Sequence, residues 1–176
     1  MSYYFALCSS EMYQQKYLEF LLEHYHELHL PYAFPETFSY LASPVLMGKG
    51  CFLCFNDEYE VIGAFGFIFG TGEHEYTDTD IVQIQAVFIL KHYRKSYLFL
   101  HSLQFFIQYL AQQRGEVREI RFWSPADEPL RRLFDKLAQR VASVQMEFGT
   151  LDEYRASFEA WQAYAAKFPV EKYFDL

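Results

Sequence analysis

Three apolar runs follow one another in the middle of this chain with no helical pattern between them. Lys49–Phe55 and Val61–Phe69 are separated by Asn56–Glu60, a segment rich in turn formers and of the length of a hairpin loop. Asp80–Leu90, rich in Ile and Val, follows after the polar connector Gly70–Thr79. The sequence therefore predicts a β-hairpin followed directly by a third strand.

A strand and two helices are expected before this hairpin. Tyr3–Cys8 is short and aromatic, which favours a strand, and Ser9–Glu11 then provides a helix N-cap with an acid in the first turn. Apolar residues at three- and four-residue spacings continue to about Leu30, where two prolines stop the helix. A shorter helix is predicted over Glu36–Leu41.

Helices and strands alternate after the third strand. The apolar stripe of Ser96–Arg114 predicts a long helix with Gly115 at its end. Asp127 caps a later helix, in which Pro129 falls in the first turn, where its missing N–H costs nothing. The remaining expected elements are the strand Val117–Trp123, the helix Asp127–Arg140, the strand Ser143–Phe148, an amphipathic helix over Leu151–Lys167 and a final strand over Val170–Leu176.

The composition indicates one folded domain spanning residues 1–176. Hydrophobic residues make up 52% of the chain and charged residues 22%, which excludes intrinsic disorder. The formal net charge of -8 disfavours generic binding to nucleic acid or to an anionic membrane. Three cysteines cannot all pair, the N-terminus lacks a signal-peptide pattern, and the longest apolar run, Val61–Phe69, is far too short to span a bilayer. We therefore expect a soluble protein in the reducing cytoplasm.

Aromatic side chains account for an unusual 20% of the residues. Rings this numerous fill a core, which is the interpretation we favour, or they line a large apolar cavity or a partner surface. The aromatic residues in the C-terminal part of the chain also have two possible roles. There a stripe of rings either caps the sheet edge or forms a homodimer seam, and it consists of Tyr154, Phe158, Trp161 and Phe168.

Three strands in a row, then a helix, a strand, a helix and a strand, is the order found in the GNAT superfamily of N-acetyltransferases. Two segments of the chain resemble that family. Val87–Phe99 aligns without gaps with its apolar strand, turn and glycine-rich loop, and Asp127–Ala138 keeps the spacing of its helix "Asn, two residues, Ala, three residues, Tyr-Glu-Lys-Leu-Gly". The resemblance implies an α+β (α/β) fold of three layers, in which helices flank a mixed, mostly antiparallel central sheet.

The resemblance also implies a reaction and a binding site. GNAT enzymes transfer an acetyl or other acyl group from a coenzyme A thioester to an amine. Acetyl-CoA or another acyl-CoA is then the expected cofactor, no metal is expected, and the acceptor is a small-molecule or protein amine. Loop amides at a helix N-terminus hold the cofactor pyrophosphate, and strand amides polarise the thioester carbonyl. Carried over to this chain, the cofactor-binding residues are Ile89, Lys91, Arg94, Lys95, Ser96, Tyr97, Leu98 and Phe99, beside a slot between splayed strands at Ile89 and Phe122.

A basic cluster supports an anion site at the same position. Lys91, Arg94 and Lys95 lie at the N-terminus of the predicted long helix, where the helix dipole favours acids. Positive charges there are unfavourable unless an anion sits on them. A solvated turn, whose cost is screened by salt, is the alternative.

Several positions depart from the family pattern. The three loop glycines are replaced by Lys95, Tyr97 and Phe99, and the turn proline by Lys91. Phe134 stands where the family often has a tyrosine that protonates the departing thiolate, and it cannot donate a proton. Gln83 and Gln85 occupy strand positions where some members carry a general base, and an amide is no base at neutral pH. The alternative function is therefore a catalytically degenerate GNAT fold that serves as a binding or protein-interaction module.

The acidic connector before the third strand contains weak candidates for the missing base. Glu73, His74 and Glu75 lie there together with Asp78 and Asp80, near the acceptor side of this fold. Either a carboxylate or the imidazole takes the proton of the amine, directly or through water, or the cluster is an ordinary solvated loop. We favour the solvated loop.

The cysteines and histidines do not predict a metal site. Cys51 and Cys54 alternate to opposite faces of a strand, and no second pair follows them. His26 and His29 are three residues apart in the first helix, but a histidine pair without a third ligand is weak evidence for a metal.

Overall fold

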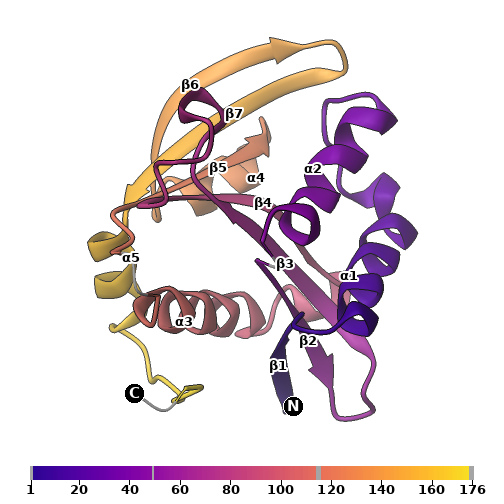
Figure 1. The fold of residues 1–176 in the computed structure, drawn as a ribbon, viewed down its shortest axis with the longest axis vertical. Helices are drawn as coiled ribbons and strands as arrows, with labels where there is room; N and C mark the ends of the chain where they lie inside the picture. Colours follow the sequence, from indigo (N-terminus) through magenta and orange to yellow (C-terminus); the bar gives the residue numbers. More distant parts are fainter. Residues whose placement is uncertain (1, 49, 114–115, 175–176) are drawn as a thin grey trace.

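A seven-stranded open sheet forms the centre of the computed structural model, which describes residues 2–48, 50–113 and 116–174 (Figure 1). The strands lie in the order β1-β2-β3-β4-β5-β7-β6, and every neighbouring pair is antiparallel except β4 and β5. The strands are β1 (Tyr3–Leu7), β2 (Cys51–Asn56), β3 (Val61–Phe69), β4 (Ile81–Ile89), β5 (Glu119–Pro125), β6 (Gln139–Met146) and β7 (Gly149–Ser157). The helices are α1 (Glu11–Glu23), α2 (Phe34–Met47), α3 (Leu98–Ala111), α4 (Glu128–Phe134) and α5 (Phe158–Ala165).

Helices cover both faces of the sheet. Tyr17 of α1 and Leu41 of α2 belong to the cluster that covers β2, β3 and β4 on one face. Phe106 of α3 and Trp161 of α5 belong to the cluster on the other face, which reaches from β2 to β7. This arrangement confirms the three-layer α+β fold with a mixed, mostly antiparallel sheet.

The first helix is shorter than its apolar pattern predicts. It begins after Ser10, whose hydroxyl accepts a hydrogen bond from the Tyr13 N–H, as expected for an N-cap. It ends at Glu23 rather than near Leu30, because a single 3-10 turn follows and His29 adopts a left-handed φ of 50°.

The second helix is longer than the predicted Glu36–Leu41, because a proline is accommodated inside it. Pro44 lacks the N–H that would bond the Tyr40 carbonyl in the helical ladder. The Ser43 hydroxyl donates to that carbonyl at 2.7 Å instead. The helix therefore continues to Met47.

The C-terminal quarter differs most from the prediction. The helix expected over Asp127–Arg140 ends at Phe134, and a strand replaces the first part of the helix expected over Leu151–Lys167. This strand, β7, pairs with β5 on one side and β6 on the other, so its backbone groups are satisfied in a sheet instead of a helix. No strand forms over residues 169–174, and the predicted ends at Lys49, Arg114, Gly115 and Leu176 lie outside the described residues.

The interior is largely aromatic. Phe52 and Phe65 stack with ring centroids 4.8 Å apart, and Phe106 lies 4.7 Å from Phe65. In the C-terminal stripe, Trp161 is buried, donates its indole N–H to the Leu137 carbonyl at 2.9 Å, and caps the sheet within its own chain. Many of the rings therefore fill the core, as favoured above.

The three cysteines are buried free thiols, and Cys51 and Cys54 belong to different clusters. Within the described ranges, no group of three or more His, Cys, Asp and Glu side chains could hold a metal ion. No helix in this part of the chain is long and apolar enough to cross a membrane.

Candidate functional site

A β-bulge in β4 lies at the centre of the candidate site. Gly66 of β3 pairs with Ala86, and the next residue, Phe67, pairs with Ile84. Gln85 is therefore an extra residue without a partner on β3, and such an insertion bends a strand and changes the facing of its side chains.

The bulge moves the later side chains of β4 to new faces of the sheet. Val82 and Ile84 belong to the cluster under α3, whereas Ala86 and Phe88 belong to the cluster under α1 and α2. An uninterrupted strand would place all four on one face. Val87 therefore points to the α3 face.

Strands β4 and β5 separate next to this bulge. They pair in parallel over Ile81–Ile84 and Glu119–Phe122. Beyond that point β4 continues along β3 to Ile89, while β5 continues along β7 to Pro125. Val87 is 36% exposed although it lies inside a central strand. A splay is thus present, but it begins only beyond Ile84 and Phe122, which still pair, rather than at Phe122 as predicted. Beyond this point the facing backbone edges of the two strands do not pair with each other.

The N-terminus of α3 lies beyond the end of β4. Its cap residue, Tyr97, makes no side-chain capping bond and is 72% exposed, with its ring 6.3 Å from that of His101. Leu98 is buried and Phe99 packs into the core, so neither side chain extends over the turn. The Leu98 N–H bonds to the Ser96 hydroxyl at 3.2 Å. The first turn of a helix has further N–H groups without helical partners, which suits it for an anion.

The three basic residues predicted around this turn do not converge. Lys91 and Lys95 are exposed. Arg94 turns back toward the other face: its Nε donates to the Ile89 carbonyl at 2.8 Å, and its guanidinium lies 5.1 Å from the centre of the Phe88 ring. The side chains of Lys91 and Lys95 remain free to meet an anion at α3, while Arg94 fixes the turn to the end of β4.

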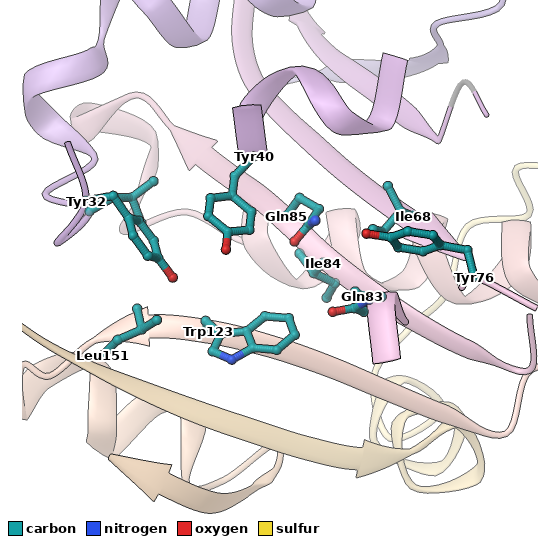
Figure 2. A pocket seen from close by; sticks show the side chains of 11 residues that line it. Tyr32, Tyr40, Ile68, Tyr76, Gln83, Ile84, Gln85, Trp123 and Leu151 are labelled. Carbon is teal, nitrogen blue, oxygen red and sulfur yellow. The ribbon is translucent and has the colours of Figure 1, made fainter. Parts of the chain in front are cut away.

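A cleft of about 300 Å³ opens on the α2 face of the same strands (Figure 2). Its walls come from the segment before α2, α2 itself, the connector after β3, and strands β3, β4, β5 and β7. The residues that line it are Leu30, Tyr32, Tyr40, Ile68, Gly72, Tyr76, Gln83, Ile84, Gln85, Trp123 and Leu151. None of these lining residues is a carboxylate, histidine, lysine, arginine or cysteine.

Hydrogen bonds and packing fix the polar groups of the cleft. The Gln83 Nε2 donates to the Gly70 carbonyl at 2.6 Å, which orients the amide and leaves Oε1 to accept. The rings of Tyr32 and Tyr40 lie 4.9 Å apart. Burial, and next the neighbouring Tyr40 and Glu36, raise the pKa of Tyr32, so its phenol stays neutral at physiological pH.

The predicted base candidates lie beside the cleft rather than in it. Glu73 and His74 are exposed in a 3-10 turn, and Glu75 is exposed directly after it. Their neighbours Gly72 and Tyr76 line the cleft instead. The structure therefore brings none of the three candidates into contact with the cleft.

Two other acids of this connector have structural partners. Asp78 accepts hydrogen bonds from the N–H and the hydroxyl of Thr71 at 2.7 and 2.6 Å, and the hydroxyl bond is the main cause of its lowered pKa. Asp80 pairs with Arg118 at 3.0 Å. These contacts hold the connector in its conformation.

Phe134 of α4 packs edge-on against Phe122, with centroids 5.0 Å apart. Its other aromatic neighbour is Tyr154 at 5.5 Å, a buried residue whose hydroxyl has no hydrogen-bond partner in the described part of the chain. The position at which the resemblance implies a proton donor is thus occupied by a packed hydrocarbon ring.

Comparison with known proteins identifies the fold. No family model and no curated protein matches the sequence. Among solved structures, a GNAT-family acetyltransferase from Staphylococcus aureus Mu50 superposes with a TM-score of 0.65 at 13% identity, over 89% of this chain and 99% of that one. The ribosomal-protein-S5-alanine acetyltransferase of Vibrio fischeri gives 0.65 at 11% identity, over 92% and 96%.

An aminoglycoside N(6')-acetyltransferase from Legionella pneumophila superposes with a TM-score of 0.59 at 12% identity, over 93% of this chain and 98% of that one. All three structures belong to acetyltransferases, two of them named for different acceptors, and each matches over nearly its whole length. At such identities the likeness concerns the backbone alone. The chain therefore has the fold of the GNAT N-acetyltransferases.

Proposed function

We propose that the chain is an N-acyltransferase, with one domain over residues 1–176, that transfers an acetyl or other acyl group from a coenzyme A thioester to a primary amine. The observation that carries the proposal is the splay of β4 from β5. It lies between the N-terminus of α3 on one face and the aromatic cleft on the other. A thioester in the slot would meet an amine held in the cleft, in a fold shared with acetyltransferases.

The residues around the slot suit the donor. The first turn of α3 offers backbone N–H groups to the pyrophosphate, and the exposed Lys91 and Lys95 add positive charge. The exposed Val87 provides an apolar wall for the pantetheine arm. Backbone N–H groups on the open edge of β4, up to Ile89, polarise the thioester carbonyl.

The rate of acyl transfer then depends mainly on how the protein positions the amine against the thioester carbonyl. The amine nitrogen attacks the carbonyl carbon, the C–N bond forms, and the C–S bond breaks as the tetrahedral intermediate collapses. Phe134 cannot protonate the thiolate. Because a thiol has an ordinary pKa near 8.5, the leaving sulfur takes its proton from water. The ammonium form of the amine has already lost one proton to water before the attack. The nitrogen of the tetrahedral intermediate then loses a second proton to water, which balances the proton that the thiolate takes up.

A calorimetric titration with coenzyme A and acetyl-CoA at two salt concentrations tests the donor half of this proposal. We expect roughly micromolar binding that weakens as salt rises, because part of the affinity is electrostatic. Lys95→Ala is expected to weaken binding and to reduce its salt dependence. Lys167→Ala removes an exposed lysine just beyond α5 and serves as the matched control. Equal effects of the two changes would refute the anion site at α3.

A second candidate function is a binding or protein-interaction module with the same fold. It is favoured by the lack of a carboxylate or histidine that could act as a base among the residues lining the cleft, and by Phe134 at the proton-donor position. This function predicts no binding of either ligand at millimolar concentration and no acyl transfer to any amine.

A further inference from the structure

Four aromatic side chains converge in the cleft from four separate segments. Tyr32 precedes α2, Tyr40 lies on α2, Tyr76 lies in the connector and Trp123 lies on β5 (Figure 2). Together they present flat apolar surfaces with phenol and indole hydrogen-bond donors at the edges. Such walls suit a planar group of a ligand, which can stack on the faces of the rings or contact their edges.

The polar groups of the cleft are neutral. Gln83 and Gln85 supply carboxamides, which can donate to and accept from another amide. The phenol of Tyr32 has a raised pKa and remains protonated. Hydrogen-bonding groups of this kind complement a neutral polar group of the ligand.

Several of the charged groups that flank the cleft in the described part of the chain are engaged elsewhere, whereas Glu36, Glu73, His74 and Glu75 are exposed. Glu153, opposite Trp123 on β7, contacts Arg155, and Arg121, opposite Gln83 on β5, contacts Glu119. The pairs are Glu153 with Arg155 at 3.4 Å, Glu119 with Arg121 at 3.2 Å, Asp80 with Arg118 at 3.0 Å, and Asp78 with Thr71. Glu36 is exposed in the first turn of α2, and its negative charge contributes to the raised pKa of Tyr32. Glu73, His74 and Glu75 remain exposed outside the cleft.

A cleft with these walls selects against strongly basic and polycationic amines. At pH 7 an α-amino group, with a pKa near 7.8, is neutral roughly 300 times more often than a lysine-type amine with a pKa near 10.4. Because the lining offers no base, this difference enters the rate of acyl transfer, and the greater nucleophilicity of the more basic free amine offsets only part of it. A polycation would in addition need unpaired carboxylates to replace its hydration.

We propose that the acceptor is an aromatic α-amino amide, which enters the cleft as the free amine with its ring among Tyr32, Tyr40, Tyr76 and Trp123. This inference rests on the proposed acyltransferase function and names its substrate class. The ring is held by the aromatic walls, and the carboxamide bonds to Gln83 or Gln85. The amine then faces the splay of β4 and β5. A free amino-acid amide and the N-terminus of a peptide both have this chemistry.

The test compares acetyl transfer to phenylalaninamide with transfer to three amines that lack some of its features. Phenylalaninamide has the ring, the carboxamide and a weakly basic α-amine. Phenethylamine keeps the ring but lacks the carboxamide and is strongly basic, alaninamide lacks only the ring, and spermidine is an aliphatic polycation. At pH 7 we expect kcat/KM for phenylalaninamide to exceed each of the other three by more than tenfold. Phenylalanyl-glycinamide separates the two sources, since a peptide substrate should match or exceed the free amide. Equal or faster transfer to spermidine would overturn the inference.

The pH dependence and one pair of variants complete the test. With no base in the cleft, kcat/KM should rise with pH up to the pKa of each acceptor, so that the break differs between phenylalaninamide and phenethylamine. A common break below pH 7 would reveal a protein base and overturn the inference. Trp123→Ala should raise KM for phenylalaninamide at least tenfold and leave alaninamide nearly unchanged, whereas Trp123→Phe should retain most of the affinity.

Tyr59→Ala, which removes an exposed ring in the hairpin loop between β2 and β3, is the control and should change neither KM. A loss from Trp123→Ala that is equal for both amides would refute the role of the ring. Failure of the proposed function has a different signature, namely no binding of acetyl-CoA and no transfer to any of the amines. Binding of acetyl-CoA with transfer to the wrong amines refutes the substrate class alone.

Discussion

A side chain at Gly66 would clash with the two helices that cover β3. A Cβ placed there would lie 2.0 Å from the Tyr17 hydroxyl oxygen and 2.8 Å from Cγ of Pro44. These atoms belong to α1 and α2, which cover β3 at the bulge. The hydroxyl would have to retreat by about 1.5 Å to reach a normal contact, and Tyr17 is fully buried. Gly66→Ala therefore forces both helices away from the sheet.

The free-energy cost of Gly66→Ala follows from the overlap of the new Cβ with Tyr17 and Pro44. Overpacking of a filled core costs about 1–3 kcal/mol, and an overlap with two helices at once belongs at the upper end of this range. Alanine recovers about 0.5–1 kcal/mol of backbone entropy relative to glycine. We expect Gly66→Ala to lower the free energy of unfolding by about 2 kcal/mol. With a urea m-value of about 2 kcal/mol/M, the unfolding midpoint falls by about 1 M.

Tyr17→Phe gives the matched control in the same contact. The Tyr17 hydroxyl is buried without a hydrogen-bond partner among the described residues, so its removal should stabilise the protein by about 1 kcal/mol. In the double variant the closest overlap is gone, and the loss should be at least about 1 kcal/mol smaller than the sum of the single effects. Urea unfolding of the four proteins measures this coupling. Additive effects, or a Gly66→Ala protein as stable as the parent, would refute the packing argument.

Three further predictions concern the buried ion pair and the turn before α3. Asp152 is buried and receives two hydrogen bonds from Arg131, at 2.7 and 3.0 Å, so Asp152→Asn should cost about 2–4 kcal/mol of unfolding free energy in urea. The hydrogen bond from Arg131 is the main cause of the lowered pKa of Asp152. The free energy that this carboxylate contributes to folding is therefore complete above pH 4 and is lost as the pH falls below it. Asp152→Asn should accordingly flatten the acid limb of a plot of unfolding free energy against pH. Arg94→Ala releases the Ile89 carbonyl and should weaken acetyl-CoA binding in calorimetry much more than Lys49→Ala, and equal effects would contradict a role for this turn.

Local sequence signals predicted the elements that local forces determine. Ser10 and Asp127 cap the helices that follow them, and the hairpin of β2 and β3 has its loop where the turn formers lie. β7 was missed because Leu151 and Tyr154 have helical spacing, whereas pairing with two strands decides the structure there. Ser157, which caps α5, was the signal that a helix begins only at that point.

The two halves of the candidate site also differed in how far the sequence could predict them. The turn and the first residues of α3 are contiguous, so a resemblance in sequence could locate them. Tyr32, Tyr40, Tyr76 and Trp123 lie far apart in the chain and meet only through the packing of α2 and the connector against β4 and β5. The bulge at Gln85 depends on the register with β3, which no local pattern reveals.

Titration of acetyl-CoA into the parent protein and into the variant Val87→Trp asks whether the splay between β4 and β5 holds a coenzyme A thioester. Val87 is partly exposed at the splay, so a larger ring there should fill the slot and leave the core intact. We expect roughly micromolar, salt-sensitive binding to the parent protein and binding at least about 100-fold weaker to the variant at an unchanged unfolding midpoint. Equal binding to both proteins, or no binding to the parent at millimolar ligand, would contradict a thioester site at the splay.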